Sequence, residues 1–333
     1  MHAPLTSPDE LNVAFLSRAL GETVTAFTYT AERSNWARHA AIRATRADGT
    51  TQALRLKLCG DTFGRSEVDY YTRDYVGMVD APLVRCHDAA YAAGVGYHLL
   101  LDDLSATHHD RKLVPPTLAH GLALARALGR LHAHHWGTGT PPDQAAQDRY
   151  FAEIRPGVAG LERATGRPYA ARFEAHAAAL RARWADPRGL TLIHGDVNPT
   201  NVLTPRDAET PLYFLDRQPF DWSFTHALAV SDLAYATAPW WPPAFRIQHE
   251  AAILRAWHEA LGQPDYAWER AQADYALCVE QCLHVPMEWC ANPENVEKMR
   301  WLWEWQLGNL QGGPVQPPPH APPKPRRSVD PAV

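Results

Sequence analysis

The sequence has no run of eighteen apolar residues, no excess of positive charge and few cysteines. The missing apolar run excludes a membrane-spanning helix of the usual length. Lysine and arginine number 32 against 37 aspartates and glutamates, and the formal net charge is −5. A chain of this charge has no basic surface field for nucleic acid and no polybasic patch for a membrane. We therefore predict neither nucleic acid nor membrane among its partners.

The five cysteines are an odd number, which does not suit a framework of disulfides. Residues 1–21 lack the basic start and apolar core of a signal peptide. Both features favour reduced thiols and a cytoplasmic protein. Cys278 and Cys282 would share one face of a helix with His284 close by, but their spacing matches no common zinc pattern. Thiols packed in an apolar helix core are the other interpretation.

The composition is that of a folded protein, because 46% of the residues are hydrophobic and 21% are charged. A length of 333 residues suggests two domains of about 150 residues each. Residues 313–333 differ from the rest, because they are rich in proline. Their composition predicts an extended or disordered tail.

Strand-like patterns fill the first third of the chain. Apolar and polar residues alternate in 52–58 after the turn signal Asp48-Gly49, which predicts a hairpin with 36–45. Lys57 falls on the face opposite the leucines of this strand. The other elements predicted here are a helix between an N-cap at Ser7 and an end at Gly21, a helix over 67–75, and strands over 84–91 and 97–101.

Helical patterns dominate after residue 105. The predicted helices cover 117–135, 171–184, 246–261, 266–283 and 294–310. A block over 190–222 interrupts them with short apolar runs separated by Gly, Pro, Asn and Asp. Polar loops on a rigid scaffold often carry function, so we expect the chemistry in this block. The order of elements predicts an α+β fold with the sheet first and the helices after it.

The block contains the sequence His194-Gly-Asp196-x-x-x-x-Asn201, and Asp216 follows at the end of a short apolar strand. Two carboxylates and an amide oxygen in this order offer one base and a pair of oxygen ligands for Mg²⁺. Phosphoryl transfer needs such a set, because a base orients the attacking hydroxyl and a metal neutralises the phosphates. Turn formation at a strand end is the alternative role of these residues.

This pattern resembles the catalytic core of the aminoglycoside phosphotransferase and choline kinase superfamily, the small-molecule branch of the protein-kinase-like fold. Residues 215–218 and 232–235 resemble its ecdysteroid-kinase-like (CHK) members most. The likeness implies a bilobal fold, with an N-lobe over 1–103 and a C-lobe over 104–312. It also implies ATP or GTP and Mg²⁺ as cofactors, and transfer of the γ-phosphoryl group to a hydroxyl of a small molecule of aminoglycoside, choline or sugar type.

The resemblance implies a role for each matching residue of the catalytic block. Asp196 matches the base that accepts the proton of the substrate hydroxyl. Asn201 and Asp216 match the metal ligands. His194 matches a position that braces the loop, and Asp232 matches a buried aspartate that anchors the loop from a helix below it.

The resemblance also implies contacts to the nucleotide. Lys57 matches the lysine that grips the phosphates, and Glu67 matches the helix glutamate that pairs with this lysine. Asp69 is a near rival of Glu67, and a solvated surface position is the alternative for both Lys57 and Glu67. The Asp102 C=O and the Leu104 N–H match the hinge contacts to adenine.

Several positions depart from the family pattern. No Gly-x-Gly-x-x-Gly loop precedes the second strand, and Ser34 and Asn35 lie in its place. Protein kinases carry a lysine where this chain has Asn198, which disfavours a protein substrate. Arg217-Gln218 replaces Phe-Gly, so that Arg217 would either neutralise phosphate charge or point outward. A pseudokinase-type nucleotide-binding module is the alternative function, and a protein kinase is a weaker one.

The acceptor site is expected in the C-terminal helices, where aromatic and acidic residues mix. Trp240 and Trp241 form a rigid aromatic pair, and Glu280, His284 and Glu288 follow among apolar residues. Rings and carboxylates together suit a cationic or polyhydroxylated molecule. The alternative interpretation places the tryptophans in the core and the carboxylates on the surface.

Overall fold

The computed structural model describes residues 2–33, 37–110, 114–207, 211–217 and 224–311. The tail over 313–333, Ser34, Asn35 and Gln218 lie outside the described residues.

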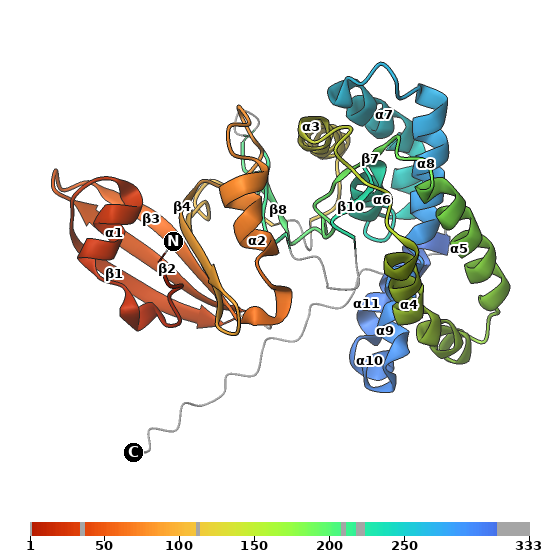
Figure 1. The fold of residues 1–333 in the computed structure, drawn as a ribbon, viewed down its shortest axis with the longest axis horizontal. Coiled ribbons are helices and arrows are strands. Elements are labelled where there is room, and N and C mark those ends of the chain that lie inside the picture. Colours follow the sequence, from red (N-terminus) through yellow and green to blue (C-terminus); the bar gives the residue numbers. More distant parts are fainter. Residues whose placement is uncertain (1, 34–36, 111–113, 208–210, 218–223, 312–333) are drawn as a thin grey trace.

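The N-terminal region is built on an antiparallel five-stranded sheet with the strand order β1-β2-β3-β5-β4 (Figure 1). The strands are β1 (Val24–Arg33), β2 (Ala37–Arg46), β3 (Thr51–Cys59), β4 (Cys86–Ala92) and β5 (Gly96–Asp102). The predicted hairpin is present as β2 and β3, and its turn contains Gly49 at φ 84°. Glycine adopts this left-handed conformation without the steric cost that a side chain would add.

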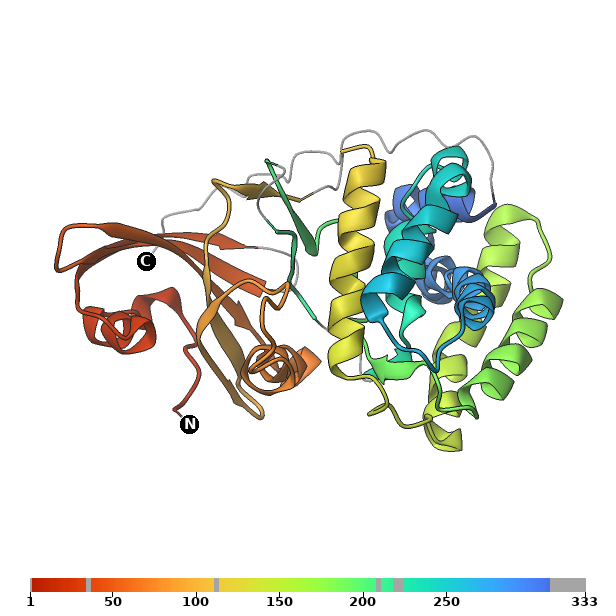
Figure 2. The same ribbon diagram turned by 90° about the horizontal axis from the view of Figure 1, so that it is seen from above.

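Helices cover both faces of this sheet. Helix α1 (Val13–Leu20) packs Phe15 and Leu16 against the face that carries the leucines of β3. Helix α2 (Ser66–Asp69) continues into the π-helical turn η3 (Tyr70–Asp74) and lies on the opposite face, toward the helical region (Figures 1 and 2). Lys57 points to this second face and is therefore buried, with 4% of its surface exposed.

The N-terminal helix differs from its prediction. Ser7 caps only the short 3-10 helix η1 (Pro8–Glu10), and α1 begins after Asn12, whose side chain accepts the N–H of Phe15. A second side-chain cap inside the segment therefore divides it into two elements. The predicted end at Gly21 is confirmed, with φ at 71°.

The rest of the chain is largely helical, as predicted. Its helices are α3 (Leu118–His134), α4 (Gln144–Thr165), α5 (Ala170–Trp184), α6 (Val230–Thr237), α7 (Pro243–Leu261), α8 (Trp268–Gln281), α9 (His284–Ala291), α10 (Pro293–Lys298) and α11 (Arg300–Gln311). Among the described residues, no helix is both long and apolar enough to cross a membrane.

Helix α4 has no counterpart in the sequence prediction, and its glycines explain how it packs. A Cβ atom at Gly157 would lie 1.7 Å from the Met287 carbonyl oxygen, and one at Gly160 would lie 2.1 Å from the Cys290 carbonyl oxygen. The backbones of α4 and α9 therefore approach too closely for any side chain at these two positions.

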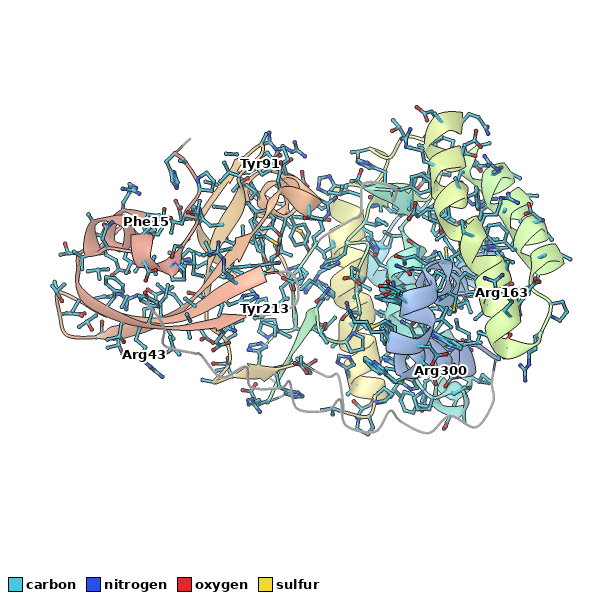
Figure 3. The ribbon with its side chains drawn as sticks, turned by 90° about the horizontal axis from the view of Figure 1, so that it is seen from below. Phe15, Arg43, Tyr91, Arg163, Tyr213 and Arg300 are labelled. Carbon is cyan, nitrogen blue, oxygen red and sulfur yellow. The ribbon has the colours of Figure 1, made fainter. Side chains whose placement is uncertain are left out.

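Short strands also occur after the N-terminal sheet. They are β6 (His108–His109), β7 (Leu190–Leu192), β8 (Val202–Pro205), β9 (Tyr213–Phe214) and β10 (His226–Leu228). β6, β8 and β9 form one small sheet, and β7 pairs with β10. Tyr213 of β9 packs against the apolar cluster of the N-terminal sheet, at the junction seen in Figure 3. The loop between β7 and β8 carries the residues from His194 to Asn201 that the sequence analysis singled out.

Candidate active site

Asp196 lies in the loop between β7 and β8 and is half-buried. Its Oδ1 accepts hydrogen bonds from Asn198 Nδ2 at 2.9 Å and from the Tyr235 hydroxyl at 3.2 Å. Its Oδ2 accepts one from Asn201 Nδ2 at 3.0 Å. Burial raises the pKa of Asp196 to about 6, although the three donors act in the opposite direction. The carboxylate is therefore held in one orientation by the loop and by α6.

Asp232 of α6 anchors the start of this loop. Its Oδ2 accepts the His194 backbone N–H at 2.7 Å, and its Oδ1 accepts the Gly195 N–H at 2.9 Å. The ring of His132 on α3 donates to Oδ2 at 3.0 Å. Buried backbone N–H groups need such partners, because an unmade hydrogen bond costs free energy.

His194 connects the catalytic loop to the strand that precedes Asp216. Its Nε2 donates to the Leu215 carbonyl at 3.0 Å, and its Nδ1 accepts the Asp196 N–H at 3.3 Å. Burial lowers the pKa of His194 to about 4, so the ring is neutral at pH 7. A neutral ring with both nitrogens engaged supports the loop and has no lone pair left for proton transfer.

Lys57, Glu67 and Asp216 meet at the buried face of the N-terminal sheet. Lys57 Nζ lies 2.7 Å from Glu67 Oε2 and 2.7 Å from Asp216 Oδ1. The Tyr97 hydroxyl donates to Glu67 Oε2 at 2.5 Å. Burial alone would lower the pKa of Lys57, but the two carboxylates raise it, so the ammonium stays charged. Asp69 is engaged by Arg65 instead, at 2.8 Å.

Asn201 and Asp216 present oxygen atoms beside this cluster. The Leu215 N–H donates to the Asn201 carbonyl at 3.1 Å, which ties the two segments together. Asn201 uses its amide nitrogen on Asp196, which leaves its amide oxygen near the Thr200 hydroxyl at 3.3 Å. The Asp216 side chain is 36% exposed. An amide oxygen and an accessible carboxylate are hard donors, so these residues fit Mg²⁺.

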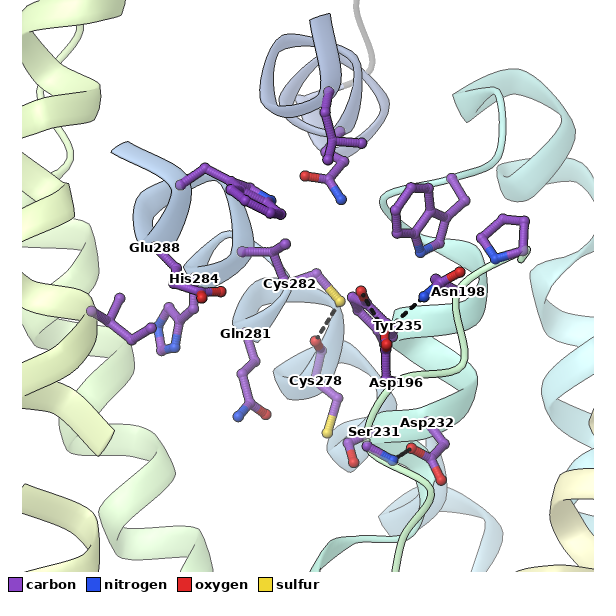
Figure 4. Close-up of a pocket in the computed structure, with 18 of the residues that line it drawn as sticks. Asp196, Asn198, Ser231, Asp232, Tyr235, Cys278, Gln281, Cys282, His284 and Glu288 are labelled. Carbon is purple, nitrogen blue, oxygen red and sulfur yellow. Dashed lines mark hydrogen bonds between the residues drawn. The ribbon is translucent and has the colours of Figure 1, made fainter. Parts of the chain in front are cut away.

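A cavity of about 480 Å³ opens beside Asp196 (Figure 4). Glu288 and His284 of α9 lie on one side of it, across from Asp196, Asn198 and Tyr235. The remaining wall includes the aromatic residues Tyr150, Phe224, Trp240, Trp289, Trp301 and Trp305. Three residues expected at the acceptor site, Trp240, His284 and Glu288, thus share one cavity with Asp196.

A match to the family model described as "Phosphotransferase enzyme family" covers residues 74–273, which is more than half of the chain. The chain belongs to this family. It is therefore a small-molecule phosphotransferase with the kinase-like α+β fold that the sequence predicts. Among curated proteins, none matches the sequence.

Solved structures of the same fold accompany this family assignment. A provisionally assigned aminoglycoside phosphotransferase from Ralstonia eutropha JMP134 is 13% identical, with 90% of this chain and 96% of that chain covered and a TM-score of 0.54. A provisionally assigned fructosamine-3-kinase from Thermobifida fusca YX-ER1 is 17% identical, with 90% and 98% covered and a TM-score of 0.49. The first of these likenesses, at 13% identity, shows the fold alone and leaves the acceptor open.

The predicted hinge residues of this phosphotransferase lie at the end of the sheet. The Asp102 N–H donates to the Arg85 carbonyl at 3.0 Å, and the Leu104 carbonyl accepts the His108 N–H at 2.8 Å. Both residues therefore stand where the chain leaves the sheet for the helical region. Their contact with adenine stays a prediction.

Two residues expected at the acceptor site lie elsewhere. Glu280 is ion-paired with Arg172 of α5, with Nη2 2.6 Å from Oε2, and does not line the cavity. Trp241 is buried and packs against Phe245 and His120. The prediction was wrong for these two residues because helix packing, which residue type does not reveal, turns them away from Asp196.

Arg217 corrects both sequence expectations, since it neither points outward nor remains available for phosphate. Its side chain is buried, with Nε donating to the Ile193 carbonyl at 3.1 Å. Its Nη1 donates to the Ser66 carbonyl at 3.3 Å and to Asp74 Oδ2 at 3.1 Å. Arg217 thus joins the segment that carries Glu67 to the strand that leads into the catalytic loop.

Sequence reasoning missed three supporting residues. His132 contacts Asp232, Asp74 contacts Arg217, and Tyr235 contacts Asp196. Only Tyr235 carried a signal, because it belongs to the segment 232–235 that resembled the family. His132 and Asp74 meet their partners across 100 and 143 residues of sequence, so no local spacing could identify them.

Proposed function

We propose that this chain transfers the γ-phosphoryl group of ATP or GTP, with Mg²⁺, to a hydroxyl group of a small molecule. The observation that carries the proposal is the position of Asp196, whose oriented carboxylate lines the cavity. Its backbone and side chain are bonded to Asn201, a candidate metal ligand. A base beside a cavity for the acceptor and next to metal ligands is the arrangement that phosphoryl transfer to an alcohol needs.

The nucleotide would bind between the two regions, with residues 1–103 as the nucleotide lobe and 104–312 as the catalytic and acceptor lobe. Lys57, fixed by Glu67, would pair with the phosphates as a buried cation. Asp102 and Leu104 would contact adenine through their backbone. Asn201 and Asp216 would hold Mg²⁺, which when bound neutralises phosphate charge.

Asp196 would act as the base. Because its pKa is about 6, it is mostly ionised at pH 7 yet close enough to neutrality to accept a proton readily. Asn198, at the position of the protein-kinase lysine, donates to this carboxylate and adds no positive charge. That difference favours a small acceptor over a protein.

Two finer assignments belong to the same proposal. The segments 215–218 and 232–235 favour the CHK branch of the family. The odd cysteine count favours reduced thiols and a cytoplasmic location.

The Asp196→Asn variant tests the function. The amide keeps the shape of the side chain but cannot accept the proton, so we expect kcat to fall at least about a hundredfold while nucleotide affinity changes little. The measurement is phosphate transfer from radiolabelled ATP to a panel of metabolites, amino alcohols and aminoglycosides. Asp265→Asn, an exposed position after α7, is the matched control and should behave as wild type. Wild-type turnover by the Asp196→Asn variant would reject the role of Asp196.

A further inference from the structure

The cavity beside Asp196 is poor in charge. Tryptophans at 240, 289, 301 and 305 line it, together with aliphatic and sulfur-containing side chains. No lysine or arginine is among the described lining residues. Asp232, also in the lining, is already bonded to backbone N–H groups and to His132. Apart from Asp196, Glu288 is thus the acidic group left to interact with a bound molecule.

Glu288 is half-buried and has no hydrogen-bond or ion-pair partner among the residues that the structure describes. Other buried or half-buried acids have one, as Asp274 has Arg183 at 2.6 Å and Glu280 has Arg172. Burial raises the pKa of Glu288 to about 7, and the negative charges of Glu153 and Asp196 act in the same direction. Ionisation of a carboxyl group that is partly buried near other acidic groups costs free energy unless a cation pairs with it.

The neighbouring histidine does not supply that cation. The Tyr150 hydroxyl donates to His284 Nδ1 at 2.8 Å, and His284 Nε2 donates to His176 Nδ1 at 3.2 Å. Burial lowers the pKa of His284 to about 3, so its ring is neutral. A positive partner for ionised Glu288 would therefore come with the ligand.

Three further polar atoms, in residues that line the cavity, are buried without a partner. They are the hydroxyl of Ser231, the indole N–H of Trp240 and the amide Oε1 of Gln306, a residue that is 1% exposed. Buried polar atoms in native proteins are almost always bonded, and exceptions in a cavity point to a ligand. An ammonium group on a bound molecule would supply the partner that Glu288 lacks.

We propose that the acceptor is an alcohol with an apolar body and a single ammonium group, which pairs with Glu288 while the hydroxyl lies at Asp196. The inference rests on the proposed function. In the reaction, the hydroxyl oxygen forms the new bond to the γ-phosphorus and the bond to the β,γ-bridging oxygen breaks. The hydroxyl proton passes to Asp196, and the nucleoside diphosphate leaves.

The aromatic side chains of the cavity indicate an apolar body for the acceptor. Tryptophan faces attract ammonium groups and cover apolar surface. A cavity of about 480 Å³ lies in the range that encloses drug-sized molecules. A polycationic aminoglycoside would leave most of its ammonium and hydroxyl groups against apolar walls without partners, which is unfavourable.

The test compares three kinds of probe on the full chain with a non-hydrolysable ATP analogue and Mg²⁺ present. They are a panel of aromatic amino alcohols represented by propranolol, the matching alcohols with carbon in place of the amine nitrogen, and kanamycin. Calorimetry gives Kd, and transfer from ATP gives kcat/KM. We expect the amino alcohols to bind at least about tenfold more tightly than their neutral counterparts, as for a hydrogen bond to a charged group.

Glu288→Gln should remove this preference for the amine and leave the affinity for the neutral alcohols unchanged. Glu259→Gln, an exposed position on α7, is the matched control and should keep the preference. Equal affinity for amine and neutral alcohols in wild type, an unchanged preference in Glu288→Gln, or a higher kcat/KM for kanamycin than for every amino alcohol would each overturn the inference. Transfer of phosphate to any of the other acceptors would keep the proposed function, whereas loss of both MgATP binding and transfer would reject that function.

Discussion

Replacing Arg217 with methionine should lower the free energy of unfolding substantially, although Arg217 directly follows the candidate metal ligand Asp216. Methionine keeps much of the apolar length of arginine and removes the guanidinium. In the wild type this group is buried and donates to Asp74 and to the carbonyls of Ile193 and Ser66. The variant leaves one buried carboxylate and two carbonyls without these donors.

The size of the effect follows from what Asp74 retains. Removing one partner of a buried ion pair typically costs about 3–5 kcal/mol. The Asp74 side chain is 7% exposed, but its Oδ1 still accepts from Arg73 Nε at 2.9 Å, and Arg73 is 66% exposed. This remaining pair keeps part of the charge compensated. We therefore expect the lower end of the range, a loss of about 3 kcal/mol in the free energy of unfolding.

Urea denaturation, followed by tryptophan fluorescence and by circular dichroism, measures this loss. Arg155→Met is the matched control, because Arg155 pairs with Glu174 at the surface with side chains 55% and 53% exposed. Such a pair is worth less than about 1 kcal/mol. A double-mutant cycle of Arg217→Met with Asp74→Asn isolates the coupling between the two charges. A loss below about 1 kcal/mol for Arg217→Met, equal to the control, would contradict the stabilising role assigned to Arg217.

Two predictions concern the nucleotide and the base. Asp216→Ala should weaken MgATP binding at least about a hundredfold, and Asn201→Ala about tenfold, because a carboxylate is a stronger ligand for a hard cation than an amide oxygen. Calorimetry measures the MgATP affinity, and equal affinity of Asp216→Ala and wild type would contradict the metal role. The kcat at saturating acceptor should rise about tenfold per pH unit up to about pH 6 and then level off, because Asp196 accepts a proton only when ionised and its pKa is about 6. A flat pH–rate profile between about pH 5 and pH 7 would exclude Asp196 as the titrating base.

Short-range patterns in the sequence were enough to predict the hairpin and the loop that carries Asp196. The alternation in 52–58 and the turn before it involve residues only a few positions apart, and β2 and β3 form there. The spacing from His194 to Asn201 is local in the same way. It places Asp196 and Asn201 in one loop, where their side chains are bonded. Such features depend on backbone geometry within one segment, which the order of residues largely specifies.

The burial of a side chain and the identity of its partners depend on segments that are distant in the sequence. The strand pattern placed Lys57 opposite the leucines, but its burial follows from α2 lying on that face. Arg217 carries no local sign that its partner is Asp74, which precedes it by 143 residues. Charge pairing in a folded chain depends on which segments pack together, and tertiary packing is a long-range property.

Glu280 and Glu288 show the same limit at the acceptor cavity. Eight residues are a little over two helical turns, so a single continuous helix would place the two side chains about 80° apart around its axis, on the same half of the helix. Helix α8 instead ends at Gln281 and α9 begins at His284, close to Pro286. The break directs Glu280 to Arg172 and Glu288 into the cavity. In the sequence, Glu280 and Glu288 are two carboxylates with nothing to tell them apart. Their surroundings differ because α9 packs closely against the glycines of α4. Only the folded chain brings α4 and α9 into contact.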